Sequence, residues 1–145
     1  MKVAHLLTPL ALLASVAVAS AAQCAYCHKS IDGVPYVLKN QAHTESYKCA
    51  YCAVAEAVGE ADWKGDVTMI SPSENPKKPV TVKRVGGKWK MYPTTAVFTE
   101  ASPIKHRVCG EQYRAFTTRA AADAYIKSGK ADAVVSLAQL IEKAS

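Results

Sequence analysis

Hydrophobic and polar positions alternate most clearly around a pair of glycines in the second half of the chain. Apolar residues flank Gly86-Gly87 on both sides, at Val80, Val82, Val85, Trp89, Met91 and Tyr92. Two consecutive glycines tolerate positive φ angles, so this pattern is typical of two antiparallel strands joined by a tight turn. The pattern therefore predicts a β-hairpin over residues 80–92.

The residues after this hairpin predict a mixture of strands and helices. Short apolar runs at 96–98, 113–116 and 133–135 indicate further strands. Thr117 or Thr118 can cap a helix that Gly129 ends, and Ser136 can cap a closing helix that carries Leu140. We therefore expect an α+β fold, a small single domain with an antiparallel, hairpin-containing sheet and two C-terminal helices.

The first 22 residues have the three parts of a secretory signal peptide. Lys2 supplies the positive charge, an apolar stretch follows, and small residues close the segment at Ala21-Ala22. The apolar stretch is short for a membrane span and is interrupted by Pro9. We expect a periplasmic or secreted protein that has no stable insertion in a membrane.

A proline-rich stretch divides the remaining chain. Residues 71–79 contain three prolines and predict a loop, because proline is excluded from helix interiors and central strands. Residues 23–70 form a segment with paired cysteines, and residues 80–145 form the α+β segment of the same domain. The loop is expected to lie within one domain.

Composition and charge remove several classes of protein. The 145 residues are 50% hydrophobic and 21% charged, which is ordinary for a globular domain and excludes wholesale disorder. The formal net charge is +6, but the basic residues are dispersed and lack an interleaved aromatic platform. We therefore expect no nucleic-acid partner.

The cysteines carry the clearest chemical signal. Two Cys-Ala-Tyr-Cys turns, Cys24 to Cys27 and Cys49 to Cys52, are separated by 21 residues. Each turn directs two sulfurs toward one point, so two turns can enclose a soft or borderline metal ion. Cys109 is the fifth cysteine and adds a thiol that can complete a site. The glycine that often follows such turns is replaced by His28 and Ala53.

Other chemistries fit the same cysteines. Four of them can pair in disulfides, each worth about 2–4 kcal/mol in a small secreted domain. Cys24-Ala25-Tyr26-Cys27-His28 also matches the attachment sequence of c-type haem, and would make the chain an electron-transfer protein. Structural zinc fits the pair spacing. The helical stretch after Cys49 and Cys52 also permits a thiol oxidoreductase.

The ligand set that we favour consists of Cys24, Cys27, Cys49, Cys52, Cys109 and His28. Such thiolates suit Cu(I), so we expect a copper-binding protein for metal delivery or storage, with a client metalloprotein as a further partner. Other residues of ligand type have ordinary alternatives: His43 and His106 as exposed loop residues, Met69 and Met91 as core residues, and Trp63 and Trp89 as packing residues. No nucleophile triad or phosphate-binding glycine loop is present, which predicts that the protein is not an enzyme.

The residues after the loop resemble the NosL family of exported copper-binding accessory proteins of nitrous oxide reductase maturation. The resemblance rests on residues 96–99, on 109–116 (Cys-Gly-Glu-Gln-Tyr-Arg-Ala-Phe) and on Thr118, Ala121, Ala122 and Tyr125, together with the pair at 24–27. It implies a small α+β fold and copper binding. This chain differs from the family pattern in Cys109-Gly110, where the family has Met-Gly, and in its second Cys-x-x-Cys pair.

Overall fold

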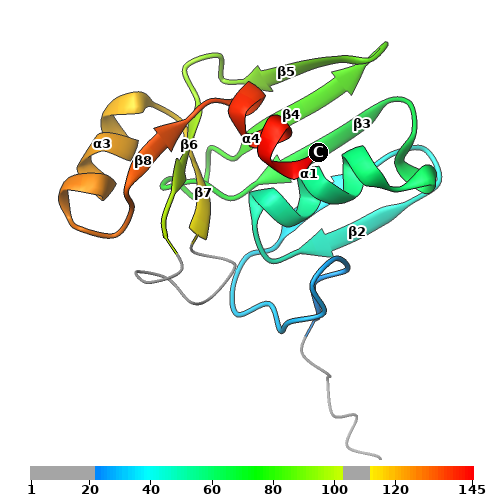
Figure 1. Cartoon of the computed structure of the whole chain (residues 1–145), viewed down its shortest axis with the longest axis horizontal. Coiled ribbons are helices and arrows are strands. Elements are labelled where there is room, and N and C mark those ends of the chain that lie inside the picture. The colour runs from blue at the N-terminus through cyan, green and yellow to red at the C-terminus, as the bar shows by residue number, and fades with distance from the viewer. Residues whose placement is uncertain (1–21, 103–111) are drawn as a thin grey trace, which may run out of the picture.

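The computed structural model describes residues 22–102 and 112–145 (Figure 1). In chain order, the elements are β1 (Tyr36–Lys39), β2 (Thr44–Tyr47), α1 (Ala50–Gly59), a 3₁₀ turn (Ala61–Trp63), β3 (Val67–Ser71), β4 (Val80–Val85), β5 (Lys88–Tyr92), β6 (Val97–Glu100), β7 (Tyr113–Phe116), α3 (Arg119–Lys127), β8 (Ala133–Val135) and α4 (Leu137–Ala144). These elements confirm the expected α+β fold. Within the described ranges, none of the helices has the length and apolar character that a membrane span requires.

The larger sheet has five strands in the order β2-β1-β3-β4-β5, and all neighbours are antiparallel. The predicted hairpin is β4 and β5, joined at Gly86 and Gly87, which have φ angles of 55° and 76°. Positive φ at both positions fits the turn that best matches the twist of antiparallel strands. Helix α1 contacts β1, β2 and β3 on one face of this sheet (Figure 1).

The smaller sheet has three strands in the order β7-β6-β8, and both pairs are antiparallel. Thr118 caps α3 by accepting a hydrogen bond from the Ala121 N–H, and Ser136 and Gln139 form a reciprocal capping box at the start of α4. Such caps satisfy backbone donors that a helix start leaves unpaired. Helix α3 packs on the small sheet, and α4 contacts both α1 and β6.

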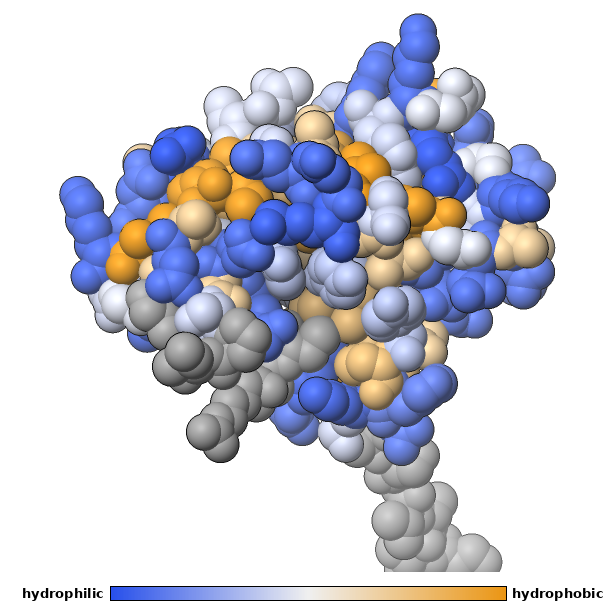
Figure 2. All heavy atoms as spheres, viewed as in Figure 1, coloured by the Kyte–Doolittle hydropathy of each residue, from blue (hydrophilic) through white to orange (hydrophobic). Residues whose placement is uncertain are grey.

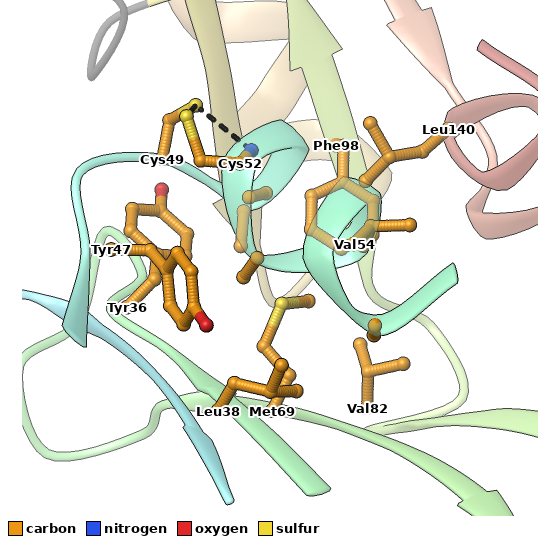
Figure 3. Close-up of a cluster of buried hydrophobic side chains, with 14 of the residues drawn as sticks. Tyr36, Leu38, Tyr47, Cys49, Cys52, Val54, Met69, Val82, Phe98 and Leu140 are labelled. Atoms are coloured by element: carbon orange, nitrogen blue, oxygen red, sulfur yellow. Dashed lines mark hydrogen bonds between the residues drawn. The ribbon is translucent and has the colours of Figure 1, made fainter. Parts of the chain in front are cut away.

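The hydrophobic core joins the two sheets through α1. Leu38, Met69 and Val82 project from the large sheet, and Phe98 projects from the small one (Figure 3). Val54 of α1 lies between them, and all five side chains are at most 1% exposed. The surface is different in character: Figure 2 shows polar side chains around small apolar areas, one of which lies over α3 and β8.

The structure changes the predicted boundary of the proline-rich loop. Ser71 pairs with Val80 as the last residue of β3, so the loop is shorter at its start than the predicted span of 71–79. The neighbouring strand, β4, holds Ser71 in the ladder, and its side chain is fully buried. The hairpin of β1 and β2 was not predicted at all. Asn40 closes its turn by accepting hydrogen bonds from the N–H groups of Ala42 and His43.

Arg84 of β4 secures the far end of α1. Its guanidinium donates to the carbonyl oxygens of Ala57 in α1 (2.7 Å), Gly65 (2.8 Å) and Trp63. It also lies over the Trp89 ring, 5.1 Å from the centroid. The last carbonyls of a helix lack partners within the helix, so a cation at this end both pairs with them and complements the helix dipole. Arg84 therefore fixes α1 against the sheet.

Replacing Arg84 with glutamine is expected to lower the free energy of unfolding by about 1–3 kcal/mol, because partly buried carbonyls at the end of α1 lose a charged donor. Urea unfolding followed by circular dichroism measures the change. Arg119→Gln is the matched control, since Arg119 is exposed and pairs with Asp123 one helical turn away. It should cost less than about 0.5 kcal/mol. Equal losses in both variants would contradict the anchoring role of Arg84.

Candidate metal centre

The first cysteine pair lies on a tight turn at the start of the described chain. The His28 N–H donates to the Cys24 carbonyl, and the Cys24 N–H donates to the Lys29 carbonyl, both at 2.9 Å. An isolated antiparallel bridge between Gln23 and Ser30 closes the base of this turn. The backbone thus forms a small knuckle, residues 23–30, that directs Cys24 and Cys27 toward the body of the protein.

His28 explains how the knuckle closes without glycine. Its φ angle is 58°, in the left-handed region that glycine normally occupies. The missing glycine counted against a metal-binding turn in the sequence. The structure shows that the required backbone conformation is nevertheless adopted, with histidine in the place of glycine.

The second pair begins helix α1 (Figure 3). Cys49 is the N-cap residue, and its Sγ accepts a hydrogen bond from the Cys52 N–H at 3.4 Å. Cys52 lies in the first turn of the helix, so its sulfur returns to the same side, 3.5 Å from the Cys49 sulfur. The start of a helix favours negative charge, and this position therefore stabilises thiolates.

Folding brings the two pairs together. The sulfurs of Cys24, Cys27 and Cys52 all lie within 4.8 Å of one another, and Cys49 adjoins them through Cys52. Cys24 and Cys49 are fully buried, Cys52 is 1% exposed, and Cys27 is partly exposed. The structure holds all four as thiols. We name these four residues the thiol cluster.

Hydrogen bonds prepare Cys24 to carry negative charge. Burial of its sulfur raises the pKa, but the backbone N–H groups of Cys27, Lys48 and Tyr26 donate to it, and the net effect is a lowered pKa. The neighbouring Cys27 side chain adds to the lowering. Thiolate is the form of cysteine that binds metal ions, so Cys24 is predisposed to be a ligand.

Lys48 ties the knuckle to the approach of α1. Its Nζ donates to the Ser30 carbonyl and pairs with the Asp32 carboxylate at 3.1 Å, and its side chain is only 9% exposed. The Ala25 N–H adds a 3.0 Å bond to the Ser46 carbonyl in β2. These contacts set the position of one cysteine pair relative to the other before any ion is bound.

A row of tyrosine rings accompanies the thiol cluster. Tyr51 stacks on Tyr113 with centroids 5.5 Å apart, and Tyr26 meets Tyr51 edge-on at 6.4 Å. The hydroxyl of the buried Tyr36 donates to the Tyr113 carbonyl. Sequence reasoning missed this row, although Tyr26 and Tyr51 occupy the same position in the repeated Cys-Ala-Tyr-Cys turn. The repeated turn therefore indicated two contacting tyrosines as well as four cysteines.

The remaining predicted ligands have different positions. His28 is exposed and does not belong to the group of close sulfurs, and His43 packs against Trp63 in the turn between β1 and β2. Met69 is buried in the core and Met91 packs against it, as predicted. Cys109 and His106 lie outside the described residues. Of the predicted set, the structure brings together Cys24, Cys27, Cys49 and Cys52.

Comparison with known proteins identifies the fold. No protein-family model matches the chain, and the search of curated proteins finds no match. The crystal structure of the mercury-bound form of MerB2 matches 78% of this chain with a TM-score of 0.59 and 18% sequence identity. The two proteins share a fold. The match spans 57% of the MerB2 chain, so this protein corresponds to little more than half of its length.

The likeness to MerB2 corrects the prediction that the protein is not an enzyme. MerB2 is an enzyme, so the prediction is contradicted at the level of the shared fold, which is all that the likeness shows. Its premise was the lack of a nucleophile triad and of a phosphate-binding glycine loop. That premise is insufficient, because clustered thiols are themselves reactive groups that either motif search overlooks.

Replacing His28 with glycine is expected to leave metal affinity unchanged and to change the free energy of unfolding by less than about 1 kcal/mol. Glycine adopts the left-handed conformation without strain, which offsets its greater loss of backbone entropy. His28→Val should instead lose about 1–2 kcal/mol, because a β-branched residue is strained there. Chemical denaturation and metal titration of both variants test this. A large loss of metal affinity in His28→Gly would establish His28 as a ligand.

Proposed function

We propose that this protein binds a thiophilic metal ion, Cu(I), through Cys24, Cys27, Cys52 and Cys49, and serves in copper delivery or storage. The observation that carries the proposal is the convergence of three thiols within 4.8 Å, with the fourth 3.5 Å from Cys52. Thiolates are the ligands that select soft ions. The mercury ion named for MerB2 is also soft, which supports the same choice for a shared fold.

Unequal burial of the four sulfurs suits an ion that must be passed on. Cys24, Cys49 and Cys52 are at most 1% exposed, whereas Cys27 reaches the surface in part. A thiol of a client metalloprotein can therefore approach the ion beside Cys27 and replace this ligand first. Since Cu(I) is satisfied by two or three soft ligands, such an exchange proceeds without a bare ion.

Structural zinc is the second candidate. The 3.5 Å separation of the Cys49 and Cys52 sulfurs fits a tetrahedral site, in which metal–sulfur bonds of about 2.3 Å place sulfurs about 3.5–4 Å apart. Three buried thiols also favour a closed site. The haem alternative has less support, because Cys24 is fully buried and its sulfur lies among other thiols, whereas a covalent haem needs space beside the sulfur.

We extend the proposal to family and location. The residues that resemble NosL include β6 and β7 and the start of α3, which pack together in the small sheet and its covering helix. The signal-peptide pattern of residues 1–22 supports export to the periplasm or the outside of the cell. Both points are proposals that rest on sequence patterns.

Anaerobic titration with Cu(I) against a chromophoric chelator tests the proposed function. We expect one tightly held ion, ultraviolet absorbance from copper–thiolate bonds, and loss of both in Cys24→Ser and Cys52→Ser. His43→Ala is the matched control and should bind as the parent does, because His43 packs on Trp63 away from the cluster. Stoichiometric zinc that Cu(I) fails to displace would favour the structural site. Binding retained in both cysteine variants would refute the proposal.

A further inference from the structure

The face of the large sheet opposite α1 carries a group of lysines. Val80 and Val82 of β4 point into the core, so the alternate residue Lys83 points outward. Register places Lys90 of β5 directly opposite Lys83, and Thr68 of β3 lies between Lys83 and Lys39 of β1. Strands lie about 4.8 Å apart, so this row of lysines extends about 14 Å across the sheet. Lys88, opposite Val85, adds a fourth charge.

These lysines repel one another, and the outward positions of the five described strands hold no acid, although Asp66 lies directly before β3 and lines a hollow with Lys39 and Lys83. Lys83 and Lys90 form a like-charge pair directly across two strands, an arrangement that destabilises a sheet. The outward positions of the five strands hold lysine, threonine, serine, tyrosine and aliphatic residues. The ion pairs of Lys48, Arg119 and Lys143 do not involve these lysines. The lysine face, which we define as Lys39, Lys83, Lys88 and Lys90, is therefore a surface of net positive charge, with Asp66 at its margin.

Protection of a sheet edge explains only part of this charge. Lysines on an edge strand discourage pairing with other chains, and Lys88 and Lys90 lie on the edge strand β5. Lys83 and Lys39 lie on β4 and β1, which have neighbours on both sides. Their charges protect no edge, so a different explanation is needed for the row as a whole.

Apolar side chains lie beside the lysine face. Tyr92, 46% exposed, begins a second outward row that continues through Thr81, Ile70 and Val37. Val85, 57% exposed, flanks the lysines on the other side. A positive stripe between partly exposed apolar and aromatic residues is the composition that binds at the interface of a membrane, where headgroups meet acyl chains.

We propose that the lysine face binds the surface of an anionic phospholipid membrane. Lysine is depleted from the cores of stable protein interfaces, where arginine is enriched, and this face contains lysine alone as its cation. Flexible point charges suit a fluid layer of headgroups, whereas specific carboxylate recognition favours the planar fork of arginine. The protein lies on the membrane without crossing it, and the thiol cluster at the start of α1 belongs to the other side of the sheet.

A hollow at one end of the lysine face is consistent with this face lying against the membrane. It has a volume of about 330 Å³ and is lined in part by Lys39, Lys83, Arg84 and Asp66. Arg84 is engaged with backbone carbonyls, and the Asp66 carboxylate accepts a hydrogen bond from the Gly86 N–H at 2.9 Å. The two lysines are therefore the groups in the hollow that can meet a headgroup phosphate.

Vesicle sedimentation tests the proposal with the predicted mature chain, which begins at Gln23. Vesicles of equal parts phosphatidylglycerol and phosphatidylcholine should bind the protein, and vesicles of phosphatidylcholine alone should not. Each lysine near an anionic surface contributes about fivefold to partitioning. Changing all four lysines to glutamine should therefore weaken binding by about 100-fold or more. Raising NaCl to about 0.5 M should release the parent protein, because the Debye length then falls to about 4 Å.

The matched control removes the same number of charges elsewhere. Lys64, Lys77, Lys78 and Lys127 are exposed and lie outside the sheet strands, so changing them to glutamine lowers net charge equally. This control should keep most of the binding, and thermal unfolding verifies that both variants fold. Equal loss in the two variants would mean that net charge alone is responsible and would overturn the proposal. Absence of binding by the parent, or binding only to acidic proteins, would overturn it as well.

Discussion

Replacing Phe98 with alanine is expected to lower the free energy of unfolding by about 3–5 kcal/mol, the usual loss for a buried phenylalanine. Phe98 is fully buried in the central strand of the small sheet, where Ala115 and Val135 are its partners on either side. Its ring lies beside Val54 of α1 and Leu140 of α4 (Figure 3). Because it contacts both helices that join the sheets, the surroundings cannot collapse to fill the space.

Urea denaturation measures the effect of this change as a lower midpoint with an unchanged slope. Val85→Ala is the control, since it removes an apolar side chain that is 57% exposed. The control should change stability by less than about 1 kcal/mol. If Phe98→Ala altered the slope instead, the two sheets would unfold separately, contrary to a core shared through α1.

Metal binding is expected to raise the free energy of unfolding by about 4 kcal/mol when the free ion is present at roughly 1,000 times its dissociation constant. The ion binds the folded cluster, whose two halves come from the knuckle and from α1. In the unfolded chain these pairs are separated by a long segment, so closing that loop around an ion is disfavoured. Metal therefore stabilises the arrangement that only the folded chain provides.

Differential scanning fluorimetry with and without the ion measures this stabilisation as a rise in Tm of more than about 10 °C. In Cys52→Ser, adding the ion should no longer raise the Tm. The Tm of this variant without metal is also expected to be lower than that of the parent, so the rise is compared within each variant. His43→Ala should keep the full rise, because its ring contacts Trp63 and not the thiols. A Tm that is insensitive to the metal in the parent chain would contradict a site shared by the two pairs.

Local signals made the second half of the chain predictable. Gly86-Gly87, Thr118, Ser136 and Gly129 mark a turn, two caps and a helix end, and each feature acts within a few residues. The β1 and β2 hairpin escaped prediction because β2 reads Thr-Glu-Ser-Tyr, in which Tyr47 is the single apolar residue and no alternating pattern appears. Its turn depends on the side chain of Asn40 and not on a glycine pair.

The sequence predicted which cysteines make up the candidate site, but not the local structure that holds them. Cys-x-x-Cys spacing identified Cys24, Cys27, Cys49 and Cys52, since it constrains each pair locally. The spacing does not reveal that one pair lies in a turn and the other at a helix start. The sequence also suggested His28 as a ligand, whereas in the structure His28 adopts the left-handed backbone conformation that closes the knuckle. The long-range contacts of Lys48 and Tyr113 have no sequence signature at all.

Helix α1 connects the thiol cluster at its start with Arg84 of β4 at its end. Its first turn supplies Cys49 and Cys52, and its last carbonyls are held by Arg84 of β4. A helix of ten residues is about 15 Å long and transmits displacement as a rigid rod. Loosening its far end is therefore expected to shift the sulfurs at its near end. On the proposed function, affinity for the ion would then depend on Arg84, a sheet residue that is not among the proposed ligands.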